Sequence, residues 1–372
     1  MDGVGDKRLI VDLDIVYHGD ARVQISIMKV TAGVSDVHLK GKLRLILNLI
    51  DHLPLVGSVE MMFLQQPALD FDLEGAANLL DLPGVNGMLR QVVFDALSAQ
   101  MVYPHRISLL ITDKVSPEKM LLPKPLGVLS VSIVEASNLP QTDFGGFLQI
   151  DPYCILQFGS ITLKTKKSSG SNPKWNEVYE FPIDIAERQS IMIDIFDSDS
   201  LSEDEHLGQT VLDVKTAQHS KIQDLWINLN NSGKLHLKTT WYDILEEPKD
   251  SDWTAKSSKV LSVYIGKVSV VSSSKALDRQ IKVTLDLESE SLSSKTVAPE
   301  EDGTTFTINE SFLSLVDKHC KRFTFKVIDT EEAKKLGQTS FEVEEVLKMP
   351  NCQYSFGKIS IGDKKVSKIQ LK

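Results

Sequence analysis

The sequence has few cysteines, no long apolar run and no excess of positive charge. Its three cysteines, Cys154, Cys320 and Cys352, lie far apart, and no two of them have the short spacing of a zinc or redox motif. This spacing predicts reduced thiols in a cytosolic protein. The apolar runs are short and strand-like, and none approaches the roughly 18 residues that would suggest a membrane-spanning helix. Any membrane contact of this chain is therefore expected to be peripheral.

Charge and motif content argue against two further classes of protein, nucleic-acid-binding proteins and enzymes. The formal net charge is −10, and no long basic stripe interleaved with aromatic residues offsets it, so a nucleic-acid partner is not expected. The chain has no Gly-x-Ser-x-Gly elbow, no His-Glu-x-x-His and no phosphate loop, and its histidines are scattered, which indicates that it is not an enzyme. A length of 372 residues with 42% hydrophobic content predicts two or three folded domains.

The first segment, residues 1–115, contains apolar residues that alternate with polar ones, as in half-buried strands. The triplet His18-Gly19-Asp20 predicts a turn, so we expect a meander of long amphipathic strands. The expected strands are Leu9 to Tyr17, Val23 to Ile27, Val37 to Leu49, Val59 to Leu64 and Leu69 to Leu73.

A helix is predicted to follow these strands. Asp81-Leu82-Pro83 is typical of a helix start, and Pro104 of a stop. Between them an apolar stripe has helical spacing: Val85, Met88, Leu89, Val92, Leu97 and Met101. A sided sheet with a sided helix fits either an ordinary core or an apolar container for a ligand, and sidedness alone does not distinguish the two.

The rest of the chain is predicted to be mainly β. A proline-containing stretch at 116–126 and a polar stretch at 246–258 are typical of linkers. The segments that they delimit, 127–245 and 259–372, consist of short apolar runs separated by turn residues, which predicts two antiparallel β-sandwiches. The predicted fold class is therefore an α+β first segment followed by two sandwiches.

Acidic residues concentrate in two loops of the middle segment. Asp143 and Asp151 lie in the first loop, and the second contains Asp197, Asp199, Asp204 and Glu205. Ca²⁺ takes six to eight hard oxygen ligands, which carboxylates from two facing loops supply in part. The alternative is that these acids are simply solvated.

Three motifs of the middle segment are similar to those of C2 domains. They are Asp151-Pro152-Tyr153, Asn172-Pro173-Lys174-Trp175-Asn176-Glu177, and Phe196-Asp197-Ser198-Asp199 ending in Leu207-Gly208. The resemblance implies a Ca²⁺ cofactor and five ligands: Asp143, Asp151, Asp197, Asp199 and Glu205. The last of these positions is usually Asp in the family.

Two groups of residues in the same segment are candidates for membrane contact. Apolar residues lie beside the acids in both loops, which suits partial insertion between headgroups: Phe144, Phe147, Leu148 and Leu201. A basic cluster of Lys164, Lys166 and Lys167 falls where C2 domains often hold phosphoinositide headgroups. The alternatives are a locally packed loop and a solvated lysine face.

The last segment is similar to a C2 domain in strand rhythm but lacks the acids. Its first loop keeps only Asp278, and Lys334 stands in the slot of the final ligand. We therefore expect a degenerate C2-like sandwich without a calcium site. It would serve as a spacer, a partner surface or a calcium-independent membrane contact.

Four motifs of the first segment resemble the second half of the SMP lipid-transfer module of extended synaptotagmins. They are Ala32-Gly33-Val34, Leu39-Lys40-Gly41, Phe63-Leu64-Gln65-Gln66-Pro67 and Asn78-Leu79-Leu80-Asp81-Leu82-Pro83-Gly84. The order of SMP before C2 is the same. The resemblance implies a tubular container that forms homodimers or heterodimers and binds glycerolipid cargo. Its apolar lining is expected to include the helical stripe from Val85 to Met101. Half of such a tube is expected to expose apolar surface.

Together these resemblances predict a calcium-regulated tether and lipid-transfer protein that binds anionic phospholipid membranes. The expected location is the cytosolic face of contact sites between the endoplasmic reticulum and the plasma membrane. Because Met1 falls just before a mid-module strand, a partial module without a membrane anchor is also expected. The alternative function is a calcium-dependent recruitment or scaffold protein that transports no lipid.

Overall fold

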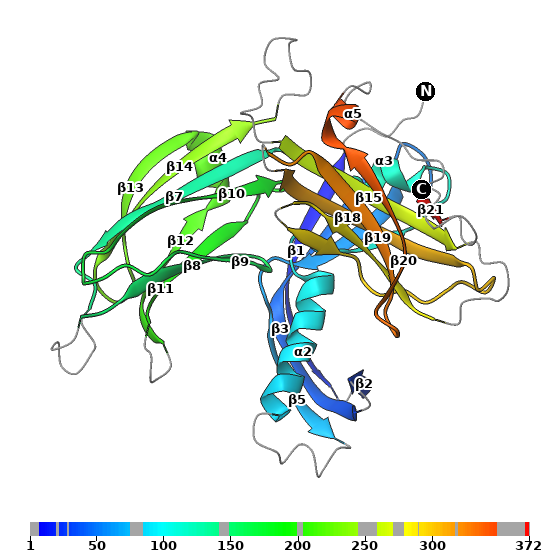
Figure 1. Cartoon of the computed structure of the whole chain (residues 1–372), viewed down its shortest axis with the longest axis horizontal. Coiled ribbons are helices and arrows are strands. Elements are labelled where there is room, and N and C mark those ends of the chain that lie inside the picture. Colours follow the sequence, from blue (N-terminus) through cyan, green and yellow to red (C-terminus); the bar gives the residue numbers. More distant parts are fainter. Residues whose placement is uncertain are drawn as a thin grey trace. The chain divides into compact units, whose positions relative to one another are not determined.

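The computed structural model describes most of the chain. The chain divides into two compact units, Met1–Val115 with Gln157–Thr162, and Ser116–Leu156 with Leu163–Lys372. Figure 1 shows strands throughout and one long helix, as the predicted fold class requires. The described residues are 7–19, 22–27, 30–74, 85–140, 149–198, 204–244, 259–270, 279–288, 290–316, 319–347 and 369–371.

An antiparallel six-stranded sheet forms the first unit. Its order is β1-β3-β4-β6, and β2 and β5 also pair with β3. Its length comes from β3, which has 20 residues. The strands are β1 (Arg8–Gly19), β2 (Val23–Ile27), β3 (Val30–Leu49), β4 (Val56–Phe63), β5 (Ala68–Glu74) and β6 (Ile107–Leu110).

The predicted turn at His18-Gly19-Asp20 is wrong. β1 and β2 do not pair with each other among the described residues, because both pair with β3: Gly19 lies opposite Val37, and Val23 opposite Val34. The chain therefore passes from β1 to β2 along one side of β3. A strand of this length has room for two successive partners.

The helix α2 (Val85–Met101) follows β5 along the chain and ends three residues before Pro104. It is anchored on β5 by Arg90, whose guanidinium donates to the carbonyl of Phe71 at 2.6 Å and to the carboxylate of Asp70 at 3.0 Å. The rings of Phe71 and Phe94 also meet, with centroids 6.4 Å apart.

One face of this sheet contains a buried polar network. Arg44 is fully buried and donates two hydrogen bonds to the carboxylate of Asp12, at 2.7 and 2.9 Å. Nearby along the strands, Asn48 donates to Glu60 at 2.7 Å, and Arg106 also reaches Glu60, at 3.1 Å. Buried charges require such partners, because an uncompensated charge in a low-dielectric interior is strongly unfavourable.

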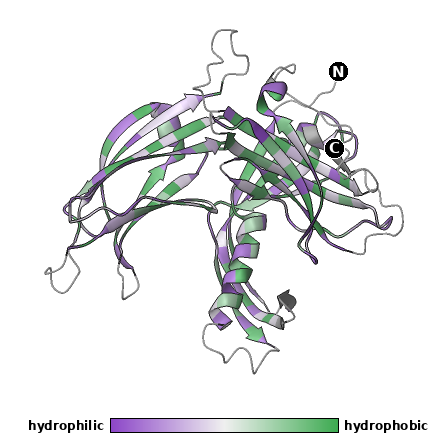
Figure 2. Cartoon of the chain, in the orientation of Figure 1, coloured by the Kyte–Doolittle hydropathy of each residue, from purple (hydrophilic) through white to green (hydrophobic). Residues whose placement is uncertain are grey.

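Two four-stranded sheets form the middle sandwich, in the orders β10-β7-β14-β13 and β12-β11-β8-β9. Hydrophobic and hydrophilic residues alternate along these strands in Figure 2, as the sequence pattern predicts. The elements are β7 (Gly127–Ser137), β8 (Pro152–Phe158), β9 (Ile161–Lys164), β10 (Lys174–Ile183), β11 (Ser190–Asp197), β12 (Glu205–Asp213), α4 (Val214–Ser220), β13 (Ile222–Asn228) and β14 (Lys234–Asp243).

The last sandwich has the orders β18-β15-β21 and β17-β16-β19-β20, with a continuous apolar core. The sequence also predicts a strand at Lys358 to Ile361, which lies outside the described residues. Its elements are β15 (Lys259–Val270), β16 (Ile281–Asp286), β17 (Ser291–Ser293), β18 (Thr305–Val316), β19 (Arg322–Asp329), β20 (Lys334–Glu342), α5 (Val343–Leu347) and β21 (Ile369–Leu371).

The predicted linker at 116–126 contains a short helix, α3 (Pro117–Leu121), with Pro117 at its first position. Met120 and Leu121 are buried, so this stretch is ordered and packed. Among the residues that the structure describes, none of the helices combines the length and apolar character that crossing a bilayer requires.

Candidate functional site: an acidic strand end and an apolar sheet face

Three of the five predicted calcium ligands are described, and the fold brings them together. Asp197 ends β11, and Glu205 begins β12 directly opposite it in the antiparallel register. Asp151 immediately precedes β8, and its backbone N–H donates to Oδ1 of Asp197 at 2.7 Å. Asp143 and Asp199 lie outside the described residues. The backbone of three acidic residues from separate segments therefore lies at one end of one sheet.

The three carboxylates differ in environment. Asp197 is only 1% exposed, whereas Asp151 and Glu205 are exposed. Oδ1 of Asp151 accepts from the hydroxyl of Ser169 at 2.7 Å, which fixes its orientation. Carboxylate oxygens are hard donors, the class of ligand that Ca²⁺ prefers. Here Asp151, Asp197 and Glu205 would hold the ion.

Asp204, the acid next to Glu205, has a different partner. Its Oδ2 accepts from the phenol of Tyr153 on β8, at 2.6 Å. Burial, together with this hydrogen bond, raises the pKa of Tyr153 to about 12, so the phenol remains a donor at physiological pH. The bond ties the start of β12 to β8.

The motif from Asn172 to Glu177 supports the loops structurally. The side chain of Asn172 accepts from the backbone N–H of Asn138 at 3.0 Å, and the indole of Trp175 donates to the carbonyl of Pro152 at 3.2 Å. Asn176 has a φ of 54° at a register shift in β10. Trp175 therefore fixes the residue that follows Asp151.

The three lysines of the predicted headgroup site lie on the edge strand β9 and just after it, and all are exposed. Lys164 places its Nζ 3.4 Å from the centre of the Tyr153 ring, a cation–π contact that the sequence did not predict. The backbone N–H of Lys166 donates to Glu177 at 2.8 Å. The apolar candidates Phe144, Phe147, Leu148 and Leu201 lie outside the described residues.

The last sandwich has the same backbone arrangement with different side chains. Asp329 ends β19 opposite Lys334 of β20, as Asp197 ends β11 opposite Glu205. The N–H of Thr330 donates to the carbonyl of Gln280, as that of Ser198 does to Asp151. Gln280 and Lys334 thus replace two of the acidic ligands.

Sequence reasoning missed the cation that compensates this site, Arg279. Its Nη1 lies 3.1 Å from Oδ2 of the fully buried Asp329 and 2.6 Å from Oε1 of Glu332. Burial alone would raise the pKa of Asp329, but hydrogen bonds from the Glu332 N–H and from Arg279 hold that pKa below its ordinary value. With Arg279 bound to these two carboxylates, the donor set does not fit Ca²⁺.

The second candidate site is the apolar face of the first unit. Side chains directly opposite each other in neighbouring strands lie on the same face of a sheet. The strand register therefore produces three cross-strand rows: Leu9, Leu47, Val59 and Leu109; Val11, Leu45, Met61 and Ile107; and Leu13, Leu43 and Phe63. We call these eleven side chains the apolar face.

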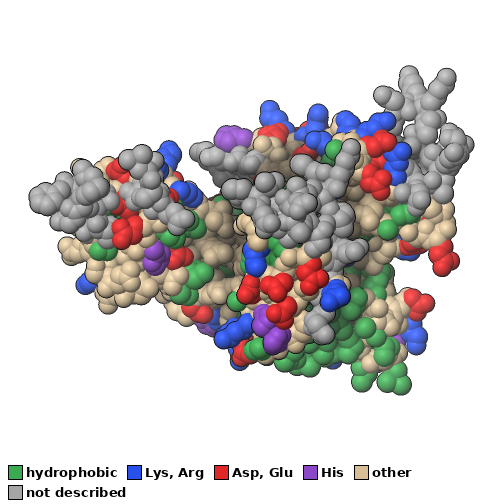
Figure 3. Space-filling view, turned by 90° about the horizontal axis from the view of Figure 1, so that it is seen from below, with side chains coloured by type: hydrophobic (Ala, Val, Ile, Leu, Met, Phe, Trp, Pro, Cys, Tyr) green, Lys and Arg blue, Asp and Glu red, His purple; other side chains and the backbone are tan. Residues whose placement is uncertain are grey.

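The apolar face is less buried than the opposite, partly polar face of the same strands. All its members except Phe63 are at least partly exposed, and Leu9, Leu13 and Leu109 are 50%, 41% and 49% exposed. On the opposite face Arg44 and Glu60 are buried. Figure 3 shows hydrophobic side chains gathered on the face of the molecule seen from below. A contiguous exposed apolar surface indicates a binding surface for an apolar ligand or partner.

The predicted lining residues of α2 are only partly accessible. Leu89 is buried, Val92, Leu97 and Met101 are half-buried, and Met88 is 56% exposed. The side chain of Val85 is outside the described set. The sequence-based list named the helix alone, whereas the structure adds the sheet rows, which the period-two alternation of the strands could have identified.

Two known domain families match this chain. Residues 1–112 match the family "Synaptotagmin-like mitochondrial-lipid-binding domain", and residues 127–229 match the C2 domain family. Extended synaptotagmin-3 of Xenopus tropicalis is 33% identical over 280 residues, which cover 72% of this chain and 31% of that protein. Human extended synaptotagmin-3 is 33% identical over 270 residues, covering 70% of this chain and 30% of that protein.

Solved structures show the same architecture. A structure of extended synaptotagmin 2 that comprises its SMP domain and two C2 domains covers 100% of this chain and 84% of its own, with 26% identity and a TM-score of 0.58. A calcium-bound structure of the two C2 domains of the same protein covers 67% of this chain and 96% of its own, with 22% identity and a TM-score of 0.56, a likeness of fold.

The chain is thus an SMP–C2 protein, in which a lipid-binding domain precedes a C2 domain. It belongs to the extended synaptotagmin family and corresponds to about a third of the length of the curated relatives that it matches.

Proposed function

We propose that this chain binds phospholipid on the apolar face and transfers it between membranes that the middle sandwich engages in the presence of Ca²⁺. The observation that carries the proposal is the inverted burial of the sheet, whose apolar face is exposed while its partly polar face is buried. Acyl chains are the ligand class that such a face suits, since each buried methylene contributes about 0.8 kcal/mol.

The acidic strand end supplies the calcium-dependent step. Bringing Asp151, Asp197 and Glu205 together concentrates negative charge, which repels an anionic membrane until a cation neutralises it. The exposed Lys164, Lys166 and Lys167 lie on the same sandwich and attract anionic headgroups at about 1 kcal/mol each. Because Arg279 neutralises Asp329 in the last sandwich, that domain contributes no calcium response.

The finer assignments follow from family membership. The proposed site of action is the contact between the endoplasmic reticulum and the plasma membrane, with a glycerolipid as cargo. The proposed domains are 1–115, 127–245 and 259–372, and dimerisation through the first of these would extend the apolar face. No step of this function requires a catalytic residue, so the proposal is a transfer protein and not an enzyme.

Native mass spectrometry of protein purified without delipidation tests the lipid half of this proposal. The expected result is protein that retains phospholipid; protein free of acyl chains would refute lipid binding.

Liposome co-sedimentation tests the calcium half. Asp197→Asn combined with Asp199→Asn is expected to abolish calcium-dependent binding to anionic liposomes. Glu187→Gln is a control, because it removes an exposed acid of the turn that precedes β11, away from the strand end at Asp197. Unchanged binding by the double variant would overturn the ligand assignment.

A further inference from the structure

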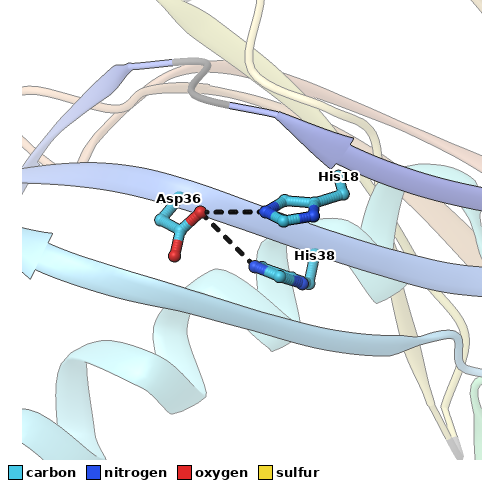
Figure 4. Close-up of side chains that lie close together, drawn as sticks. All are labelled: His18, Asp36 and His38. Atoms are coloured by element: carbon cyan, nitrogen blue, oxygen red, sulfur yellow. Dashed lines mark hydrogen bonds and ion pairs between the residues drawn. The ribbon is translucent and has the colours of Figure 1, made fainter.

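A cluster of two histidines and an aspartate lies on the sheet of the first unit, on the opposite side of the strands from the apolar face. His18 of β1 and His38 of β3 are direct cross-strand partners, and Asp36 precedes His38 by two residues on the same strand. Because side chains alternate along a strand, all three project from one face of the sheet. Figure 4 shows both imidazoles directed toward the Asp36 carboxylate.

The distances between the polar atoms match those of a metal centre. Nε2 of His18 lies 3.3 Å from Oδ1 of Asp36, and Nε2 of His38 lies 3.4 Å from the same oxygen. One ligand atom from each residue can be chosen so that all three lie within 4.8 Å of one another. Two ligands at about 2.0 to 2.1 Å from a tetrahedral zinc ion are separated by about 3.3 to 3.4 Å.

The backbone positions Asp36 in a way that an ordinary strand would not. Asp36 has a φ of 48°, in the left-handed region that is unfavourable for most residues. The pairing of β3 with β5 shifts its register between Ser35 and His38, and Asp36 lies in this interval. On the other side of β3, Asp36 separates the part that pairs with β2 from the part that pairs with β1. Its Oδ1 lies beside the two imidazole rings, near Nε2 of each (Figure 4), and the ring centroids are 3.8 Å apart.

Neighbouring charges leave the cluster accessible. Asp70 is the cross-strand partner of His38, but its carboxylate is bound by Arg90 at 3.0 Å. The side chains of His18, Asp36 and His38 are 66%, 56% and 46% exposed, so an ion reaches them from solvent. With two imidazoles and one carboxylate as ligands, a fourth position remains for water or for a group from another molecule.

We propose that His18, Asp36 and His38 form a binding site for a divalent transition-metal ion of the zinc class. Imidazole nitrogen with one carboxylate oxygen is a donor set typical of Zn²⁺ and unlike the all-oxygen set of the calcium site. Since its ligands come from β1 and β3, the bound ion would cross-link these strands where the pairing of β3 passes from β1 to β2.

Isothermal titration with Zn²⁺ in millimolar Ca²⁺, which occupies the acidic strand end, tests the proposal. Wild-type protein is expected to bind one Zn²⁺ through this site, and His38→Gln or Asp36→Asn to weaken that binding at least about tenfold. His52→Gln is the matched control, because it removes an exposed histidine from the loop between β3 and β4. Circular dichroism melting without metal verifies that each variant is folded.

A second readout distinguishes coordination from nonspecific binding. Co²⁺ in this site is expected to give the intense visible bands of a four-coordinate N/O complex, and His38→Gln to abolish them. Equal Zn²⁺ affinity in wild type and His38→Gln, or no Zn²⁺ binding by folded wild type, would overturn the proposal. The three side chains would then be joined only by hydrogen bonds.

Discussion

Placing one charge on the apolar face is expected to remove bound lipid without unfolding the protein. Leu13 on β1 is suited to this test because it is already 41% exposed in the absence of lipid and lies opposite Leu43. Replacing Leu13 with Glu forfeits about 1 kcal/mol of apolar contact with an acyl chain, taking roughly two-fifths of the value of a fully buried leucine.

The carboxylate adds a larger penalty. Facing hydrocarbon, a charged side chain costs about 2.5 to 3.5 kcal/mol on insertion scales. The sum of about 3.5 to 4.5 kcal/mol corresponds to a loss of lipid affinity of roughly 10²- to 10³-fold. Leu109→Glu, on β6 at the other edge of the β1-β3-β4-β6 order, is expected to act in the same way.

The assay is native mass spectrometry of each variant after incubation with phospholipid vesicles. Val16→Glu is the matched control: it is an apolar, exposed residue of the same strand, but it lies on the opposite face. The expected result is lipid-bound wild type and Val16→Glu, with lipid-free Leu13→Glu. Equal lipid content in all three proteins would refute the assignment of the apolar face.

Three further predictions concern stability and the last sandwich. Asp12→Ala leaves the fully buried Arg44 guanidinium without its carboxylate and is expected to lower the free energy of unfolding by about 3 to 5 kcal/mol in urea titrations. The double variant Asp12→Ala, Arg44→Met is expected to lose less stability, because no buried charge remains. Equal losses in the two variants would contradict the ion-pair explanation. Burial raises the pKa of Glu310 to about 7, whereas the unfolded chain has the ordinary value of about 4.5. Between these two pH values the folded state binds more protons than the unfolded state, so the stability falls as the pH rises from about 4.5 through 7. Glu310→Gln is therefore expected to stabilise the protein by about 3 kcal/mol at pH 8 and hardly at pH 4, and a pH-independent effect would exclude this cause. Finally, Asp329→Asn is expected to leave the number of bound Ca²⁺ ions unchanged in titration calorimetry, and the loss of an ion would show that Arg279 does not replace calcium.

Local patterns predicted much of the fold. Apolar alternation identified β1 and β5 to within a residue or two, and helical spacing identified α2 with its end before Pro104. The pairing of β1 and β2 with β3 was not predictable in this way, because the 20-residue length of β3 depends on residues such as Thr31 and Gly33 that lack clear alternation. The helix α3 was missed because the prolines of the stretch 116–126, only one of which lies in the helix, are typical of linkers.

The candidate calcium ligands were identifiable from local motifs, and the fold places the backbone of Asp151, Asp197 and Glu205 at one end of one sheet. Arg279 was not, since its partner Asp329 is 50 residues away and only the fold brings the two together. The same holds for the cluster of His18, Asp36 and His38: its two histidines read as scattered until the strand register places them side by side.

Vesicle-to-vesicle transfer of a fluorescent phospholipid, measured with Ca²⁺ and with a chelator, tests the proposed function most directly. The combination of an apolar face with a calcium-binding strand end predicts transfer that rises with Ca²⁺ in wild type, is lost in Leu13→Glu, and no longer responds to Ca²⁺ when Asp197 and Asp199 are both replaced by Asn. Calcium-dependent vesicle binding without any transfer by wild-type protein would contradict the lipid-transfer function and leave a recruitment protein.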